Sequence, residues 1–555
     1  MPVIEIDVRD LKSLLGKDVS LERITEAIPL MGAEMEEVGD TKIRVEFFPN
    51  RPDLYSVEGV ARALKGLLGL EKGAPDCPCS PSGIDVKVDP SVNDVRPFIV
   101  CGVVKNVGVS DPLIRSLMDL QEKLHLTLGR KRRKVAIGVH DMARLKAPFV
   151  YRGAAPDEVR FVPLGKSEAM SLHEILQRHE KGVDYASILA GFPRYPVIED
   201  ANGQVLSFPP IINGTLTEVN ESTRDIFLDV TGTNMRALDV ALNVLTYVLK
   251  DRGGSVESVN VSYPDRAIVR PDLSTPEMRL SLPWALGIIG MHADARAAQN
   301  ALERMRYGAE IQGDEITVWI PPYRSDILHP IDIVEDLAIG LGYGRLPSLL
   351  LTASTFGSVR GIEQLSDMAV AALIGYGYLE VTTLTLSNEI EQARAPRFGC
   401  NALTKITNPA SEESDCLRIS LLPSLMGVLK GNKHRHLPQR LFEVGDVARD
   451  HLNTRLCAGV SMHPEASFTE GKALVLGLAR DLGLGPMELK KRSEPMFMDG
   501  RCASILVSGF EAGVIGEANP EVISGYGLSN PIVAFELDLS GVNKFISKHM
   551  DTSKT

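Results

Sequence analysis

The stretch IPPYRSDILHPIDIVEDLAIGLGYGRLP, residues 320–347, indicates most about the fold and function of this chain. Pro330 suits the first turn of a helix, because its missing N–H would have no partner there in any case. At 100° per residue, one face of this helix is apolar and the opposite face is acidic. The apolar face carries Ile331, Val334, Leu337, Ala338 and Leu341, and the acidic face carries Asp332, Glu335 and Asp336. The stretch therefore predicts an amphipathic helix that begins near Pro330.

Asp326 precedes the acidic face by one turn, so four carboxylates fall within eleven residues. Like charges at this spacing repel one another unless cations lie between them, and hard oxygen ligands suit Mg²⁺. One interpretation is a magnesium site formed by Asp326, Asp332, Glu335 and Asp336. The other is an acidic helix start that complements the positive end of the helix macrodipole. The spacing alone leaves both interpretations open.

The same stretch resembles the signature of the β subunit of phenylalanyl-tRNA synthetase. That signature has a Pro, Tyr/Trp and Arg run, then Asp-Ile, then Asp-Ile-x-Glu-Asp/Glu, and it closes on Gly-Tyr-x-x-Ile/Leu-Pro. The matching positions are Pro321, Tyr323, Arg324, Asp326, Ile327, Asp332, Ile333, Glu335, Asp336, Gly342, Tyr343, Leu346 and Pro347. The resemblance implies that the four matching carboxylates bind a Mg²⁺ cofactor near the junction with an α subunit.

Two further blocks carry this resemblance. Residues 50–64 match the family's N-R-P-D-x-x-S-x-x-G-x-A-R-x-L run, and residues 408–445 match its N-P-x-S-x-E, L-R, S-L-L-P-x-L and L-F-E-x-G pattern. In the family the second block belongs to a degenerate copy of the class II catalytic module, which packs against the true catalytic subunit. We find no arginine after a Gly-rich strand near the carboxy terminus that would hold nucleotide phosphates. Amino-acid activation is therefore expected on another chain.

Residues 208–245 resemble the family's editing module, which hydrolyses tRNA charged with tyrosine in error. Hydroxyls, amides and one carboxylate beside a turn are suited to holding a carbonyl and positioning a water. The polar residues in question are Asn213, Asp229, Thr231, Thr233 and Asn234, of which we assign Asp229, Thr231 and Thr233 to editing catalysis. The alternative is that residues 231–234 simply end a strand and cap a helix. No H-x-x-H or H-E-x-x-H pair occurs, and we assign no catalytic histidine.

Residues 129–134, GRKRRK, form a basic loop between a helix predicted over 112–126 and a strand that begins at Val135. Such a run either binds phosphates, here those of the tRNA acceptor end, or is a solvated loop. The net charge of −12 argues against a chain that wraps nucleic acid through its overall field. Contacts with RNA are therefore expected to be local.

The 555 residues are enough for three or four domains, and a composition of 44% hydrophobic and 24% charged residues is typical of soluble globular proteins. No apolar run is long enough to span a membrane, and the amino terminus lacks the pattern of a secretory signal. Cys77 and Cys79 are close but lack the paired spacing of a zinc site, so reduced thiols are expected. These features favour a cytoplasmic protein with no membrane role.

The chain is predicted to be an α+β multidomain protein. An N-terminal α+β domain spans residues 1–75, and the Pro-, Gly- and Ser-rich stretch 71–89 reads as a linker. The remaining divisions are an α/β editing domain at 89–264, a small winged-helix-like domain with the magnesium site at 266–350, and a class II synthetase-like antiparallel sheet with flanking helices at 351–555.

The resemblance implies the β subunit of an α2β2 phenylalanine–tRNA ligase, and the short length resembles the archaeal and eukaryotic form. ATP, phenylalanine and tRNA are the expected substrates, the first two bound through the α subunit. One alternative is a free-standing deacylase that clears mischarged tRNA, and another is a non-enzymatic tRNA-binding scaffold. The degenerate module favours the first interpretation, because its partner surface would leave an apolar face exposed in a monomer.

Overall fold

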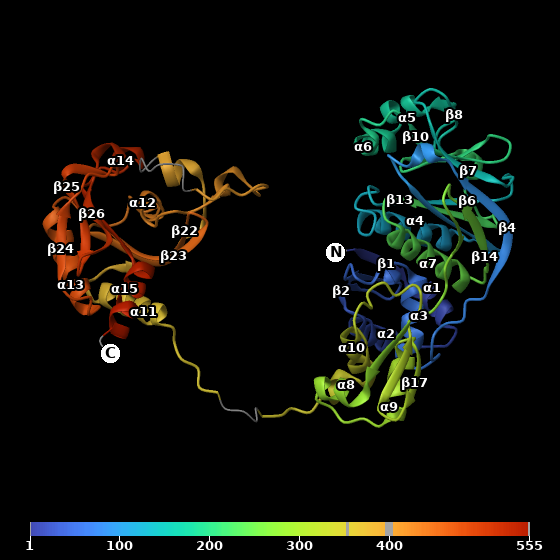
Figure 1. The fold of residues 1–555 in the computed structure, drawn as a ribbon, viewed down its shortest axis with the longest axis horizontal. Helices are drawn as coiled ribbons and strands as arrows, with labels where there is room; N and C mark the ends of the chain where they lie inside the picture. The colour runs from blue at the N-terminus through green and yellow to red at the C-terminus, as the bar shows by residue number, and fades with distance from the viewer. Residues whose placement is uncertain (1, 351–354, 395–402, 553–555) are drawn as a thin grey trace. The chain divides into compact units, whose positions relative to one another are not determined.

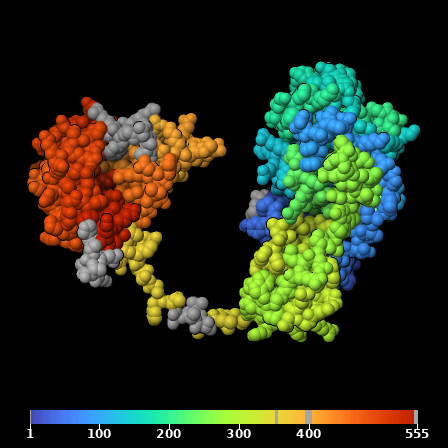
Figure 2. Space-filling view, viewed as in Figure 1, coloured from blue at the N-terminus to red at the C-terminus, as the bar shows by residue number. Residues whose placement is uncertain are grey.

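The computed structural model describes residues 2–350, 355–394 and 403–552. The chain forms two compact units, residues 1–350 and 351–555 (Figure 2). The expected start of the last domain, at residues 351–354, lies outside the described residues. Within the described ranges, no helix has both the length and the apolar character needed to cross a membrane.

The N-terminal part of unit 1 is a three-stranded antiparallel sheet in the order β1-β3-β2, with helices packed on it (Figure 1). Its elements are β1 (Val3–Asp7), α1 (Val8–Leu15), α2 (Leu21–Ala27), β2 (Ala33–Val38), β3 (Lys42–Phe47) and α3 (Val57–Leu67). Residues 50–53, Asn-Arg-Pro-Asp, lead into α3, where Ser56 Oγ accepts the Gly59 N–H at 3.2 Å. Only glycine fits at position 59, because a Cβ there would lie 1.7 Å from the Asp53 carbonyl oxygen.

The centre of unit 1 is a ten-stranded mixed sheet in the order β12-β11-β10-β7-β4-β14-β5-β13-β6, with β15 paired to β14. Its strands are β4 (Cys79–Val88), β5 (Phe98–Lys105), β6 (Val135–Asp141), β7 (Phe149–Ala154), β10 (Tyr195–Glu199), β11 (Val205–Phe208), β12 (Ile212–Asn213), β13 (Ile226–Gly232), β14 (Ser255–Ser262) and β15 (Ala267–Arg270). Strand β4 runs parallel to both β14 and β7, and the other pairs are antiparallel. Strand β6 ends this order, so one of its edges pairs with β13 and the other is open to side chains.

Two long helices, α4 (Asp111–Leu126) and α7 (Met235–Asp251), lie along one face of this sheet (Figure 1). Their apolar residues share one core with the side chains of Val100, Leu228 and Val230. The opposite face has a second core, to which Phe227 contributes. Side chains alternate along a strand, so Asp229 and Thr231 lie on the Phe227 side of β13. Helices α5 (Leu172–Arg178) and α6 (Glu180–Leu189) pack near β10 and β11.

The linker expected at residues 71–89 is wrong in its second half, because residues 79–88 form β4 inside the large sheet. Pro81 and Gly83 are residues that strands disfavour, so the sequence of this strand is typical of a linker. Only Val86 and Val88 of the strand are buried. Pairing with β14 and β7 stabilises the strand despite the low strand propensity of its residues.

The last part of unit 1 is a three-stranded sheet in the order β16-β18-β17 with three helices. The elements are β16 (Glu277–Ser281), α8 (Leu282–Ile289), α9 (Ala295–Arg304), β17 (Gly308–Gln312), β18 (Glu315–Trp319) and α10 (Pro330–Leu341). Helix α10 begins at Pro330 as predicted and packs on α9. Gly340 permits this close approach, because a Cβ there would lie 2.4 Å from the Ala301 carbonyl oxygen.

Unit 2 contains a seven-stranded sheet in the order β19-β22-β23-β27-β26-β25-β24, which is antiparallel except for the β19–β22 pair. The strands are β19 (Leu379–Glu380), β22 (Gln439–Arg449), β23 (Leu452–Met462), β24 (Met487–Lys491), β25 (Phe497–Val507), β26 (Phe510–Ala518) and β27 (Ile532–Asp538). The helices include α11 (Gly361–Gly375), α12 (Leu422–Gly431), α13 (Phe468–Asp481) and α15 (Leu539–Thr552). The predicted α+β class is confirmed.

Candidate functional site

Two of the four predicted magnesium ligands converge on a buried arginine. The Arg324 guanidinium donates to Asp326 Oδ1 and Oδ2 at 2.9 and 2.7 Å, and its Nη2 also donates to Asp336 Oδ2 at 2.7 Å. The Tyr307 hydroxyl donates to the same Asp336 oxygen at 2.5 Å. Burial alone would raise the pKa of Asp326, but the Arg324 cation outweighs burial and lowers that pKa. Arg324 therefore pairs with both carboxylates, one positive charge against two negative ones.

The other two predicted ligands have different surroundings. Asp332 Oδ2 accepts hydrogen bonds from the backbone N–H groups of Leu328 and His329, both at 2.8 Å, and so caps the start of α10. Glu335 is exposed. In the part of the chain that the structure describes, no group of three or more His, Cys, Asp or Glu side chains is arranged to hold a metal ion. The structure thus brings together two of the four residues, and helix capping accounts for Asp332.

Asp229 and Thr231 line a cavity of about 180 Å³ beside the edge strand β6. Both side chains are almost completely buried. The cavity is also lined by residues from α4, the basic loop 129–134, β6 and the segment 207–213, among them His125, Arg132, Ser207 and Asn213. Ser207 Oγ donates to Asn213 Oδ1 at 3.1 Å. Carboxylates, hydroxyls and an amide therefore meet at a single cavity, as editing chemistry requires.

Thr233, the third residue assigned to editing, lies outside this lining and is exposed. It follows the end of β13, and its backbone N–H donates to the Lys134 carbonyl oxygen at 3.1 Å. Asn234 caps α7, because its side chain accepts the Ala237 N–H at 3.0 Å. The alternative of a strand end and a helix cap therefore describes residues 233–234, and the polar cavity involves residues 229 and 231.

A histidine that sequence reasoning missed lies directly behind Asp229. His140 Nε2 is 2.6 Å from Asp229 Oδ2, and its Nδ1 is 2.8 Å from Thr217 Oγ1. The ring is fully buried. Room for this contact comes from Gly138, where a Cβ would lie 2.0 Å from Asp229 Oδ2 and 2.5 Å from His140 Nε2. The Gly-x-His spacing on the strand that begins at Val135 is visible in the sequence, but the pairing of that strand with the one carrying Asp229 is not.

Charged groups from α4 and the basic loop complete the cavity. Arg132 Nη2 donates to Glu122 Oε1 at 2.6 Å. His125 and Arg132 together hold the pKa of Glu122 at about 2. Burial lowers the pKa of His125 to about 4, so its ring is neutral near pH 7 and its Nε2 accepts the Ile137 N–H at 2.9 Å. The cavity wall thus carries the paired Arg132, the neutral His125 ring and a second cationic residue, Lys181.

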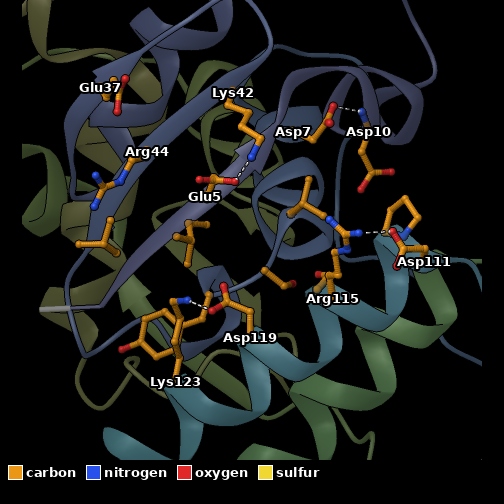
Figure 3. Close-up of a pocket in the computed structure, with 17 residues that line it drawn as sticks. Glu5, Asp7, Asp10, Glu37, Lys42, Arg44, Asp111, Arg115, Asp119 and Lys123 are labelled. Atoms are coloured by element: carbon orange, nitrogen blue, oxygen red, sulfur yellow. Dashed lines mark hydrogen bonds and ion pairs between the residues drawn. The ribbon is translucent and has the colours of Figure 1, made fainter. Parts of the chain in front are cut away.

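A second cavity, of about 760 Å³, separates the N-terminal sheet from α4 (Figure 3). Its walls carry both signs of charge, and most of the labelled side chains pair across or along them. Lys42 contacts Glu5, Lys123 contacts Asp119, and Arg115 contacts Asp111 at 2.9 Å. These exposed, mutually paired charges are typical of a solvated crevice between domains.

The sheet of unit 2 has a cavity of about 520 Å³ with a strongly acidic lining. Its carboxylates are Asp450, Glu494, Glu511, Glu536 and Asp538, and its arginines are Arg449 and Arg492. Arg449 Nη2 donates to Glu536 Oε2 at 2.7 Å, and Arg492 contacts both Glu494 and Glu511. Both arginines are therefore neutralised by carboxylates, and the remaining acidic lining would repel nucleotide phosphates.

Models of known protein families match three stretches of the chain. Residues 103–246 match the family model of the B3/4 domain, residues 278–343 that of the tRNA synthetase B5 domain, and residues 346–539 that of the phenylalanyl tRNA synthetase beta chain CLM domain.

Similar full-length sequences include the phenylalanine–tRNA ligase beta subunit of Methanothrix thermoacetophila, 44% identical over 97% of this chain and 100% of that one. The corresponding protein of Archaeoglobus fulgidus is 42% identical over 97% of this chain and 98% of that one. An N-terminal fragment of the phenylalanyl-tRNA synthetase beta subunit from Pyrococcus horikoshii is a similar solved structure, with a TM-score of 0.60 and 37% identity over 62% of this chain and 100% of that one. The chain belongs to the family of phenylalanine–tRNA ligase β subunits.

Proposed function

We propose that this chain assembles with an α subunit as an α2β2 complex in the cytoplasm, where the pair attaches phenylalanine to its tRNA with ATP. The names of the relatives support a β subunit of a ligase. The acidic cavity of unit 2 supports a division of labour in which the α subunit binds ATP and phenylalanine. Co-expression with a class II α subunit tests the assembly, and two chains that purify separately and stay inactive on mixing would contradict it.

Within this complex, we propose that the cavity beside β13 hydrolyses tyrosyl-tRNA. The observation that carries this proposal is the buried contact between Asp229 and His140 at the cavity wall. Asp229 accepts a proton from a water that attacks the ester carbonyl carbon. The bond from that carbon to the ribose oxygen then breaks, and the ribose oxygen takes the proton. Thr231 lies on the same face of β13, where its hydroxyl holds the reacting ester.

The buried contacts of His140 give it the role of a positioning residue. It holds one oxygen of Asp229, and Thr217 holds the other side of the ring. Selectivity for tyrosine would follow from a polar group in the lining that bonds the phenol hydroxyl. Sites of this kind reject the analogue lacking the hydroxyl by roughly 10⁴–10⁵ in favourable cases, because a buried polar group is left unpaired.

A deacylation assay on the assembled enzyme with tyrosyl-tRNA tests this site. Asp229→Ala and Thr231→Val are expected to slow hydrolysis by about 10²-fold while phenylalanine charging continues. The matched controls Asp18→Ala and Thr41→Val remove the same types of side chain from exposed positions in the N-terminal part of the chain. If both cavity variants clear tyrosyl-tRNA as fast as the parent, the pocket lies elsewhere or this domain does not edit.

We further propose that Asp326, Asp332, Glu335 and Asp336 bind Mg²⁺, as the resemblance implies. The donor set suits a hard cation, but binding must compete with the Arg324 contacts to Asp326 and Asp336. Mg²⁺ titration of the assembled enzyme by calorimetry, without ATP, tests the site. Glu335→Gln is expected to weaken binding about 10-fold, and Glu22→Gln is the control at another exposed helix position. Equal affinities for the two variants would remove Glu335 from the ligand set.

The four-domain division at residues 1–75, 89–264, 266–350 and 351–555 also stays a proposal, although β4 and β15 extend the sheet of the second domain beyond residues 89–264. Under it, editing, magnesium binding and α-subunit docking belong to successive parts of one chain. A free-standing deacylase and a tRNA-binding scaffold remain the alternatives, and no observation favours either of them.

A further inference from the structure

A buried arginine joins the proposed editing cavity to the basic loop. Arg96 is 1% exposed. Its Nε donates to Thr231 Oγ1 at 2.9 Å and its Nη2 to the Thr231 carbonyl oxygen at 2.6 Å. Its Nη1 donates to the carbonyl oxygens of Arg132 and Arg133 at 3.1 and 3.4 Å. One guanidinium therefore fixes both the cavity-lining residue of β13 and the backbone of the loop.

The contact with Arg96 also orients the Thr231 hydroxyl. A hydroxyl has one hydrogen and two lone pairs, and here one lone pair accepts the Arg96 Nε–H. The hydroxyl hydrogen must therefore point away from Arg96. Because Thr231 lines the cavity, this leaves the hydroxyl free to donate to an oxygen bound there. Arg96 thereby sets Thr231 as a hydrogen-bond donor without touching a substrate itself.

The loop that Arg96 holds has an unusual backbone. Three consecutive residues, Arg130, Lys131 and Arg132, have φ values of 48°, 54° and 65°, in the left-handed region that side chains disfavour. Arg132 points inward, where it donates to the Ile211 carbonyl at 2.9 Å and stacks on the Tyr185 ring at 4.5 Å. Arg132 is buried, whereas the side chains on either side of it in the loop are exposed.

Three outward cations result, on Arg130, Lys131 and Arg133. Within residues 2–350, 355–394 and 403–552, no carboxylate lies within ion-pair distance of these three side chains. Paired surface cations are common in this chain; Arg152, for example, contacts two carboxylates. A strained loop that presents three unpaired cations beside a cavity is suited to the backbone phosphates of a nucleic acid.

We propose that the loop 130–133 binds backbone phosphates of the RNA acceptor strand, and that Arg96 is a positioning residue that links this binding to the geometry of Thr231. The inference rests on the proposed editing function and names the binding element of that site. Burial lowers the pKa of Arg96 to about 10, with Asp229 as the opposing charge, so the guanidinium remains protonated at neutral pH without a carboxylate in direct contact. Retaining a buried cation on neutral oxygens is costly, which favours a role beyond packing.

The first arm of the test measures binding of an acceptor-stem RNA hairpin ending in CCA to the assembled enzyme at several salt concentrations. Arg130→Gln/Lys131→Gln/Arg133→Gln is expected to reduce the slope of log Kd against log salt by about 2. The matched control Arg9→Gln/Lys17→Gln/Arg23→Gln removes three exposed cations from the N-terminal part and is expected to leave the slope unchanged. Equal slopes for the loop variant and the parent would overturn the binding site.

Arg96→Lys keeps the charge but loses the forked contacts to the loop and Thr231. It is expected to weaken hairpin binding about 10-fold in the parent, and to add little in the background of the loop variant. If the two losses simply multiply, Arg96 does not act through the loop and the coupling is wrong. Thermal unfolding and phenylalanine charging of each variant show that the assembled enzyme is intact.

The second arm follows tyrosyl-tRNA hydrolysis. Arg96→Lys is expected to lower kcat about 10-fold or more, whereas the loop variant raises KM with kcat little changed. In a Thr231→Val background, Arg96→Lys is expected to have no further effect on kcat, and an undiminished effect there would overturn its role in orienting Thr231. A parent enzyme that binds the hairpin through the loop but hydrolyses no tyrosyl-tRNA would overturn the proposed function, while the binding arm would still decide the coupling.

Discussion

The cavities beside β13 and on the sheet of unit 2 each contain a buried carboxylate, but the groups that contact this carboxylate differ between them. Asp229 contacts an imidazole and faces a cavity whose other acid, Glu122, is paired with Arg132. Glu536 accepts from Ser420 Oγ and the Leu421 N–H at 2.7 and 2.8 Å and is paired with Arg449.

The difference teaches which carboxylate is able to do chemistry. Every oxygen of Glu536 is occupied by a structural donor, and four more carboxylates surround it. Such a site is suited to holding α12 and β22 in place, and it repels a triphosphate. Asp229 is held by an imidazole ring, next to hydroxyls and space for a substrate. Proton transfer requires that arrangement.

The prediction with the largest expected effect is that unit 2 does not activate phenylalanine with ATP. The purified single chain is expected to show no measurable phenylalanine-dependent ATP–pyrophosphate exchange, because the arginines of its cavity are paired with carboxylates. Adding the α subunit is expected to restore exchange. Exchange by the single chain above a blank lacking phenylalanine would show that the acidic cavity binds ATP after all.

A smaller effect sharpens the role of the Asp229–His140 contact. Gly138→Ala places a methyl group 2.0 Å from Asp229 Oδ2, so the pair must separate. We expect a destabilisation of about 3 kcal/mol and about 10²-fold slower tyrosyl-tRNA hydrolysis. Gly108→Ala is the control in the same part of the chain, because no atom lies within 4 Å of its added Cβ. Unchanged hydrolysis by Gly138→Ala would mean that the contact is dispensable.

The part of the site that the sequence predicted depends on local periodicity. Asp229 and Thr231 are two residues apart on an apolar strand, so they necessarily share a face. Helix α10 likewise begins at Pro330, where a local rule places it. The β-subunit family and the α+β class, expected from motifs along the chain, are confirmed by the relatives and the domain matches.

The missed features depend on pairings between distant segments. His140 reaches Asp229 only because β6 and β13 pair with Gly138 opposite Asp229, a register that local sequence does not define. Arg96 reaches Thr231 across 135 residues of chain. Arg324 lies next to the predicted magnesium ligands in the sequence, yet its contact with Asp336 requires the turn before α10 to fold back on the helix.

The smallest expected effect concerns pH and should belong to unit 1 alone. His125 has a pKa of about 4 when folded, below the ordinary histidine value of 6.5, so on acidification the unfolded chain takes up a proton first. The neutral ring contributes its full stability above pH 6.5, and this contribution is lost as the pH falls toward 4. The loss has reached about 2 kcal/mol at pH 5. Urea unfolding followed by hydrogen exchange separates the two units, and the loss between pH 7.5 and pH 5 should appear in α4 and β6.

His125→Gln should lower stability at pH 7.5 but flatten this pH dependence, because it has no proton to gain. If the parent and the variant lose equal stability over this interval, another group in unit 1 carries the pH dependence and the ring is not buried as a neutral acceptor.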